Sequence, residues 1–163
     1  MSTRSNVCLK LREEDKNADL KTPWGDTINP QGLGYLQTYI HFDGYIEGVG
    51  LDLIHSDEIK TYEDALNWIL EGHRPTIDES YYNWRGEEIS PQIVETPSWD
   101  EEYLYVLEED ENGKIIPYVC IDTYNEEHYY KVSDMLKLFD EMGSYNDHTF
   151  NVLIKKYPKK DFN

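Results

Sequence analysis

Basic residues are scarce in this sequence. Its 163 residues include 15 Lys and Arg against 33 Asp and Glu, which gives a formal net charge of -18 at pH 7. A field of this sign repels the phosphates of nucleic acids and the anionic headgroups of membranes, and it attracts cations and basic protein surfaces. Direct binding of DNA or RNA is therefore the first function to be discarded.

Cysteines and long apolar runs are also scarce. Only Cys8 and Cys120 occur, each within a short apolar run, which indicates packed thiols in a reducing compartment. The sequence shows neither the charged and apolar regions of a signal peptide nor the roughly 18 to 20 apolar residues that span a bilayer. We therefore expect a cytoplasmic protein that is not associated with a membrane.

Motifs of catalysis and of cofactor binding are missing as well. No G-x-S-x-G, Walker, dinucleotide-binding or zinc-binding spacing occurs, and the five histidines are scattered. The loop Asp110–Gly113 resembles the start of a calcium loop, but the acidic residue that would close such a loop is absent. We therefore expect no cofactor and favour a protein without catalytic activity.

The best candidate for a metal or ligand site is the segment 41–55. Its potential ligands are His41, Asp43, Glu47, Asp52 and His55. A strand–turn–helix corner could bring two or three of them, above all His41, Asp43 and Glu47, around a divalent cation. The alternative is structural: Asp43 shapes a turn, Glu47 lies favourably at a helix N-terminus, and the other side chains are solvated.

Aromatic residues are abundant, at 13% of the sequence, with fourteen Tyr and four Trp. This content separates the chain from disordered proteins, which combine high charge with few aromatic residues. A chain of this length can bury one apolar core without disulfides. We therefore expect a single acidic domain over residues 1–163.

Local sequence patterns predict strands at 5–11, 35–42, 103–109, 114–122 and 149–156, and helices at 47–56, 61–70 and 132–142. The second helix begins at a capping box formed by Thr61 and Asp64, and Gly143 ends the third. The pair Asn112-Gly113 predicts a two-residue type I′ turn in a hairpin. Because strands come in pairs without regular alternation with helices, we expect an α+β fold, with a mixed or antiparallel sheet and two to three helices packed on one face.

Three segments lack such patterns. Residues 12–34 are rich in charge, proline and glycine, which predicts an inserted loop that bulges from the fold. Residues 75–99 predict irregular structure with one short strand near Tyr81. Residues 157–163 are expected to form a solvated basic tail.

The negative charge is concentrated in the middle of the chain. Residues 52–127 hold 21 acidic and 4 basic residues, a net charge of -17. B-DNA carries about one charge per 1.7 Å of axis, so this excess equals the charge of roughly 29 Å of duplex. Since a chain of this length has a radius of gyration of about 15 Å, the charge can imitate a duplex only if it gathers on one face. The alternative is an ordinary solvated surface that keeps an acidic protein in solution.

Three segments resemble a family of small, functionally uncharacterised phage and prophage proteins. They are Met1–Ser5 (MSTRS), His41–Gly50 (HFDGYIEGVG) and Tyr82–Glu88 (YNWRGEE). Proteins of this family begin with MSTR and carry an H-[FW]-D-G-Y-x-E-G-V-G motif, whereas this sequence has a long insertion at 12–34 and Ile46 where proline is common. The resemblance implies a phage accessory protein, a class whose acidic members often block restriction or CRISPR nucleases by imitating DNA.

Two hypotheses follow from the sequence. The first is a non-enzymatic anti-defence protein of the DNA-mimic type, which binds the basic surface of a nucleic-acid-binding restriction or CRISPR protein in the host cytoplasm. The second is a small nucleotide- or metal-binding protein or enzyme that uses the His41–His55 corner.

The first hypothesis places the partner-binding surface at and around the predicted hairpin. Its residues are Asp100, Glu101, Glu102, Glu108, Glu109, Asp110, Glu111, Glu126 and Glu127. Reversing the charges of Glu108, Glu109 and Glu111 is expected to abolish binding while the fold survives.

Overall fold

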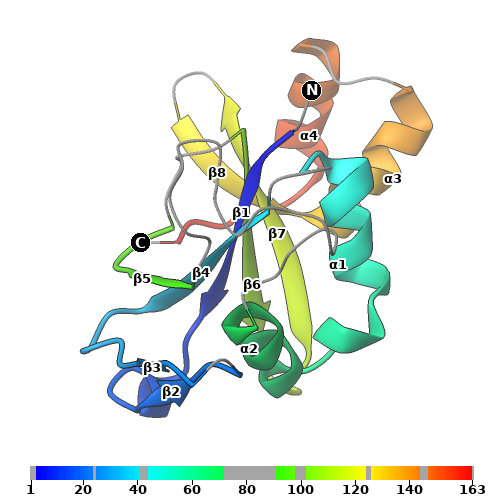
Figure 1. Cartoon of the computed structure of the whole chain (residues 1–163). Coiled ribbons are helices and arrows are strands. Elements are labelled where there is room, and N and C mark those ends of the chain that lie inside the picture. The colour runs from blue at the N-terminus through cyan, green and yellow to red at the C-terminus, as the bar shows by residue number, and fades with distance from the viewer. Residues whose placement is uncertain are drawn as a thin grey trace.

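The computed structural model of the chain describes residues 3–23, 25–40, 44–71, 91–97, 102–123, 126–143 and 147–162. Its main feature is a six-stranded mixed sheet with the strand order β5-β4-β1-β6-β7-β8 (Figure 1). Along the chain these strands are β1 (Ser5–Lys10), β4 (Tyr35–Ile40), β5 (Gln92–Val94), β6 (Tyr103–Glu109), β7 (Ile115–Thr123) and β8 (Glu126–Lys131). The neighbours β1 and β6 are parallel, and the other neighbouring pairs are antiparallel.

Helices cover one face of this sheet. They are α1 (Leu51–His55), α2 (Tyr62–Leu70), α3 (Val132–Met142) and α4 (Asp147–Lys156), and the one-turn segments η2 (Ile46–Gly50) and η3 (Asp57–Ile59) flank α1. Their buried side chains share one core with alternate residues of the strands, such as Leu9 and Leu107. Successive side chains of a strand point to opposite faces, so these residues define the helix face. The predicted α+β fold, with a mixed sheet and helices packed against it, is confirmed.

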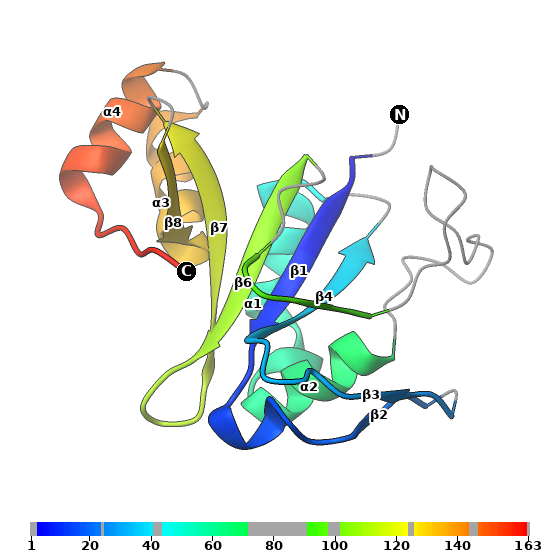
Figure 2. The ribbon, with the colours of Figure 1, turned by 90° about the vertical axis from the view of Figure 1, so that its left-hand side faces the viewer.

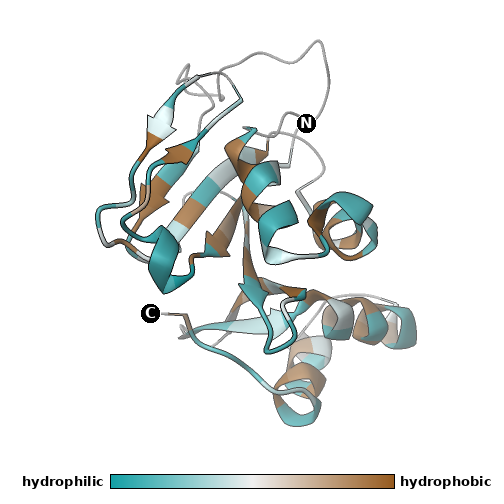
Figure 3. Ribbon diagram, turned by 90° about the horizontal axis from the view of Figure 1, so that it is seen from below, coloured by the Kyte–Doolittle hydropathy of each residue, from teal (hydrophilic) through white to brown (hydrophobic). Residues whose placement is uncertain are grey.

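Local sequence signals set several boundaries. Asp64 N donates a hydrogen bond to Thr61 Oγ1 at 3.2 Å, and Thr61 N donates to Asp64 Oδ2 at 3.1 Å, so the predicted capping box is present. The helix α3 spans the predicted residues and ends at Gly143, whose φ of 74° is the left-handed conformation that glycine adopts without a Cβ clash. Along the helices, hydrophobic and hydrophilic residues lie on different sides, as the colours of Figure 3 show.

The predicted hairpin of β6 and β7 is present, but the prediction of its turn type was wrong. Asp110 N donates to Lys114 O at 2.8 Å and Gly113 N donates to Asp110 O at 3.1 Å, so the loop has three residues with Gly113 left-handed at φ 80°. The Asp110 carboxylate accepts hydrogen bonds from the amides of Asn112 and Lys114. These bonds stabilise a type I turn followed by a glycine bulge in place of the type I′ turn.

The predicted strand at 149–156 is a helix, α4. Thr149, Val152 and Ile154 are β-branched residues, which favour strands, yet Ile154 is 42% exposed. Thr149 and Leu153, four residues apart, are fully buried, and this spacing places both side chains on one face of a helix. The short strand β5 and the edge strand β8 were not predicted. The strand predicted near Tyr81 lies outside the described residues.

The inserted segment 12–34 is partly structured. It contains the one-turn helix η1 (Glu13–Asp15) and a small hairpin of β2 (Leu20–Lys21) and β3 (Thr27–Ile28). Leu20 is buried in the core, and the Tyr62 hydroxyl of α2 donates to Asp15 Oδ2 at 2.6 Å. The segment is therefore tied to α2 at its beginning.

The C-terminal residues are docked on the second face of the sheet, so the expectation of a solvated tail was wrong. Phe162 is buried, and its ring centroid lies 4.9 Å from that of Tyr129 and 5.4 Å from that of Tyr118. Lys160 exchanges two backbone hydrogen bonds of 2.8 Å with Tyr129 of β8. Figure 2 shows this segment, in red, returning from α4 toward the sheet. The tail completes the smaller of the two apolar clusters.

We predict that Phe162→Ala lowers the free energy of unfolding by about 2–4 kcal/mol, because it removes a buried aromatic ring and leaves a cavity. Urea denaturation followed by circular dichroism measures this change. Lys155→Ala on the exposed surface of α4 serves as the control and should change stability by less than about 0.5 kcal/mol. An equal effect of both substitutions would contradict the docking of the tail.

The glycines of the 44–50 corner have a packing role. A Cβ on Gly44 would lie 2.9 Å from Arg4 C and from Ser5 Cβ, closer than side chains tolerate. Gly44 N donates to Thr3 O at 2.9 Å, and the Tyr105 hydroxyl donates to Gly44 O at 2.6 Å. A Cβ on Gly50 would lie 3.2 Å from Val132 Cγ1 of α3. The corner is therefore pressed against β1 and α3.

We expect Gly44→Ala to destabilise the protein by about 1–3 kcal/mol, since the added methyl group meets backbone atoms that cannot rotate away. The urea midpoint measures this loss. Gly34→Ala is the matched control, because its Cβ would meet only Glu95 O at 4.0 Å, an ordinary contact distance. A stable Gly44→Ala variant would show that β1 and the corner can move apart.

Candidate functional site

Glu108 of the predicted partner-binding surface is engaged in the fold. Its Oε2 lies 3.3 Å from Lys10 Nζ, and its Oε1 accepts a hydrogen bond from Lys160 of the tail. The Glu108 side chain is only 16% exposed. Its carboxylate is therefore held between two lysines on the tail side of the sheet.

Glu109 is engaged on the opposite face. Arg12 Nε donates to Glu109 Oε1 at 2.8 Å, and Arg12 Nη2 donates to Glu109 Oε2, which forms a two-bond pair. The same guanidinium donates to Glu63 Oε1 at 2.9 Å and lies 4.2 Å above the ring centroid of Tyr62. The hydrogen bond from Arg12 holds the pKa of Glu109 below its ordinary value. Glu109 thus links the hairpin, the inserted segment and α2.

The other described members of the predicted surface are divided between the two ends of the sheet. Asp110 shapes the hairpin turn, and Glu111 is exposed beside it. Glu102 and Glu127 are exposed at the other end of the sheet, and Glu102 lies 3.2 Å from Arg4. The seven residues of β6 separate Glu102 from the turn by about 23 Å. Asp100 and Glu101 lie outside the described residues, as does the side chain of Glu126.

Reversing Glu108 and Glu109 would therefore not be a neutral change for the fold. Each reversal would place a cation against the lysines or the arginine that these carboxylates now bind, at partly buried positions. A loss of partner binding in such variants would be confounded by a loss of stability.

A second group of acids lies on the consecutive elements η2, α1, η3 and α2. We call it the acidic helix layer; its residues are Glu47, Asp52, Asp57, Glu58, Glu63, Asp64 and Glu71. Six of the seven are exposed, and Asp64 is half-buried. Lys60 is the one Lys or Arg in residues 47–71, and it pairs with Asp57 at 2.7 Å. Residues 47–71 therefore carry a net charge of -6, to which Arg12 of the inserted segment adds a cation at Glu63.

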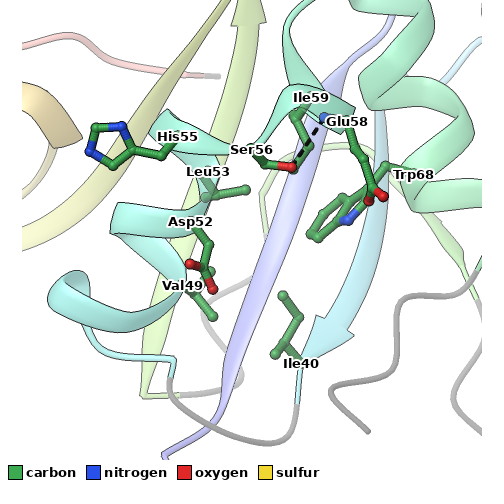
Figure 4. A pocket seen from close by; sticks show the side chains of 9 residues that line it. All are labelled: Ile40, Val49, Asp52, Leu53, His55, Ser56, Glu58, Ile59 and Trp68. Carbon is green, nitrogen blue, oxygen red and sulfur yellow. Dashed lines mark hydrogen bonds between the residues drawn. The ribbon is translucent and has the colours of Figure 1, made fainter. Parts of the chain in front are cut away.

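A cavity of about 380 Å³ opens in this layer between α1, η3 and α2 (Figure 4). Its lining residues are Ile40, Val49, Asp52, Leu53, His55, Ser56, Glu58, Ile59 and Trp68. The five apolar side chains are at most 7% exposed, whereas Asp52 and Glu58 are exposed. The cavity therefore has apolar walls and carboxylates at its mouth. A second, neighbouring hollow is also lined by Glu58 and Trp68, and it reaches Glu71 at the end of α2.

The local sequence explains why this cavity forms. Ser56 Oγ accepts a hydrogen bond from Glu58 N at 3.1 Å, so Ser56 caps η3 and ends the run of α1. The turn that follows directs Ile59 into the core and leaves Glu58 at the rim, beside the Trp68 ring in Figure 4. Sequence reasoning did not single out Glu58 or Trp68, although the Ser-Asp-Glu sequence of a helix start was a usable signal.

Only some of the predicted metal ligands of the segment 41–55 belong to the described residues. His41 and Asp43 lie outside the described residues, and Glu47 is exposed on η2. Asp52 and His55 line the cavity, but the imidazole of His55 points away from Trp68 in Figure 4. Across the described ranges, no three His, Cys, Asp or Glu side chains are placed to hold a metal ion.

A further hollow of about 460 Å³ lies beside the docked tail. It is mainly polar, and its residues include Glu127, His128 and Asp161. His128 Nδ1 lies 2.7 Å from Asp161 Oδ1, and its Nε2 lies 3.4 Å from Lys159 Nζ. This histidine therefore contacts the tail through both ring nitrogens, which gives it a structural role.

Comparisons of the chain with protein-family models, with curated proteins and with solved structures gave no match. In the part of the chain that the structure describes, no helix combines the length and the apolar character needed to cross a membrane.

The Arg12–Glu109 pair predicts a pH-dependent contribution to stability. A carboxyl whose pKa is lowered in the folded state stabilises the fold above its unfolded pKa of about 4.3, and the contribution disappears as the pH falls through the folded pKa. We expect Glu109→Gln to cost about 1–2 kcal/mol at pH 7. Urea denaturation of both proteins should show this difference shrinking below about pH 4. A constant difference would contradict the ionic origin of the effect.

Proposed function

We propose that the protein is a non-enzymatic inhibitor that occupies the basic, nucleic-acid-binding surface of a host restriction or CRISPR protein, with the acidic helix layer as its contact surface. One observation carries this proposal: residues 47–71 hold seven acids against Lys60 alone, and six of these acids are exposed. An exposed surface of this charge attracts a basic partner and steers its approach.

The charge of the layer matches that of a short stretch of duplex. Its net charge of -6 equals that of about 10 Å of duplex, at about one charge per 1.7 Å. The nine residues of α2 alone are about 14 Å long. The layer can therefore replace a short stretch of DNA, about three base pairs, in a basic groove.

The hairpin acids support this role less well than the sequence suggested. Glu108 and Glu109 are already paired with Lys10, Lys160 and Arg12, so their charges are compensated within the fold. The assignment to a phage anti-defence protein comes from the resemblance to small phage and prophage proteins. The charge pattern supports a basic partner.

A second candidate function is a small ligand-binding protein or enzyme that uses the corner around Asp52 and His55. The cavity that these residues line favours it. Phosphate groups would meet the carboxylates of Asp52 and Glu58 at the mouth, so a cation fits this cavity better than a nucleotide does. A thermal-shift screen of divalent cations and nucleotides distinguishes the candidates, because the inhibitor proposal expects no stabilisation by either.

We predict that the exposed charges of the layer control partner binding. The triple variant Glu47→Gln, Asp52→Asn and Glu58→Gln should weaken the complex by about tenfold or more, because it removes half of the net charge at the contact. Bacterial nucleic-acid-binding proteins captured by the wild-type chain, and released by added duplex DNA, are then purified for titration. Binding should also fall steeply as salt is raised to about 0.5 M, where the Debye length is only a few ångströms.

The matched control carries the same charge change on the surface that the sequence predicted. In this variant Glu102, Glu111 and Glu127, all exposed, become glutamine. We expect it to bind almost as the wild type does. A larger loss in the control would move the contact to the hairpin side. Affinity that is unchanged at high salt, or capture that duplex DNA does not reverse, would refute the proposal.

A further inference from the structure

We infer that the cavity between α1, η3 and α2 receives an arginine side chain of the partner protein. This inference rests on the proposed function for the basic character of the partner, and it adds the anchor residue that the surface recognises. It is carried by three features of the molecule: the combination of apolar walls with two carboxylates, the absence of a cation that compensates those carboxylates within the described chain, and a similar arrangement elsewhere in the fold.

The walls of the cavity suit the stem of a long side chain. Ile40, Leu53, Ile59 and the Trp68 ring offer apolar surface below the rim. Arginine and lysine bury their methylene groups on such surfaces while the charged head stays at a polar boundary. The volume of about 380 Å³ is near the lower end of the range for ligand pockets, about 300–1,000 Å³. It therefore suits one side chain better than a folded peptide segment.

The mouth of the cavity suits the charged head. Asp52 of α1 and Glu58 of η3 reach it from two different elements, and neither pairs with a lysine or arginine within the ranges that the structure describes. Trp68 lies beside Glu58. A guanidinium can stack on an indole face and donate two parallel hydrogen bonds to a carboxylate, whereas an ammonium group lacks the planar geometry for both. Arginine is therefore the preferred occupant.

The fold already contains one completed site of this kind. The Arg12 guanidinium lies 4.2 Å above the Tyr62 ring and binds the carboxylates of Glu109 and Glu63. Tyr62 and Trp68 both belong to α2, and both sites combine an aromatic ring of this helix with carboxylates from α2 or its neighbours. At the first site the arginine comes from the inserted segment of the same chain. We assign the partner's arginine to the second site by the same chemistry.

Other occupants fit less well. A nucleotide would bring phosphates against Asp52 and Glu58. A divalent cation would require a shell of about six oxygen ligands, but most of the lining is apolar. A purely apolar side chain would leave both carboxylates without compensation beside it.

Titration of the full-length protein with Nα-acetyl-arginine amide, followed by NMR, tests the inference. The methyl signals of Ile40, Leu53 and Ile59 and the indole signal of Trp68 should shift and saturate together. Nα-acetyl-citrulline amide, which has the same shape without the charge, should bind at least about tenfold more weakly. Absence of a saturable shift in these signals, or equal binding of the two probes, would overturn the inference.

Single substitutions locate the site. Asp52→Asn and Glu58→Gln should each weaken the arginine probe several-fold, whereas Asp57→Asn should not. Asp57 is the matched control, because it lies next to Glu58 in η3, is exposed and does not line the cavity. The urea midpoints of all variants confirm that they are folded. Equal weakening by Asp57→Asn would reduce the effect to general electrostatics and reject the cavity.

The captured partner separates this inference from the proposed function. If Glu58→Gln weakens the partner more than Asp57→Asn does, and one arginine-to-alanine change in the partner removes that difference, the anchor is supported. If the partner binds through the acidic helix layer but the two variants behave alike, the inference fails and the proposed function stands. If the arginine probe binds but no DNA-displaced partner is captured, the cavity is a site for a free cation and the partner assignment fails.

Discussion

The two neighbouring carboxylates at the end of β6 are the constraint on which much of this structure depends. Because successive strand residues point to opposite faces, Glu108 and Glu109 serve different sides of the sheet. On the tail side, Glu108 binds Lys10 and Lys160 and so holds the C-terminal segment over the sheet. On the helix side, Glu109 binds Arg12 and so joins the inserted segment to α2. One dipeptide thereby fastens both outer layers of the fold.

This arrangement redistributes the charge excess of the chain. The bases supplied by β1, the inserted segment and the tail are used near the hairpin, where they compensate acids that are partly buried. In the acidic helix layer, Lys60 pairs with Asp57, and Arg12 pairs with Glu63 as well as with Glu109. Among the residues that the structure describes, net negative charge therefore remains at α1, η3 and α2, although the sequence shows its highest density of acids near the hairpin. A count of charges along a chain does not locate potential in space, because compensation acts between strands and segments that are distant in the sequence.

The sequence predicted the features that depend on neighbouring residues. The capping box at Thr61, the stop at Gly143 and the hairpin of β6 and β7 are local, and each is present. The features that it missed depend on distant partners. Phe162 is buried because aromatic residues from three strands meet it, and nothing in its own segment indicates this. The β-branched and apolar residues of the segment 149–154 also occur in strands, and only the packing of Leu153 in the core shows that the segment is a helix.

The candidate site follows the same division. The acids of residues 47–71 were visible as charges, but the cavity exists only because the end of β4, α1, η3 and α2 meet there. Convergence also gives the site its chemical character. Carboxylates from two elements at the edge of an apolar hollow are complementary to a group that is cationic at one end and aliphatic along its stem. Arg12 of the same chain already makes such a contact, since its guanidinium lies over the Tyr62 ring and binds Glu63. A partner's arginine would bind the cavity by the same combination of ring and carboxylate contacts.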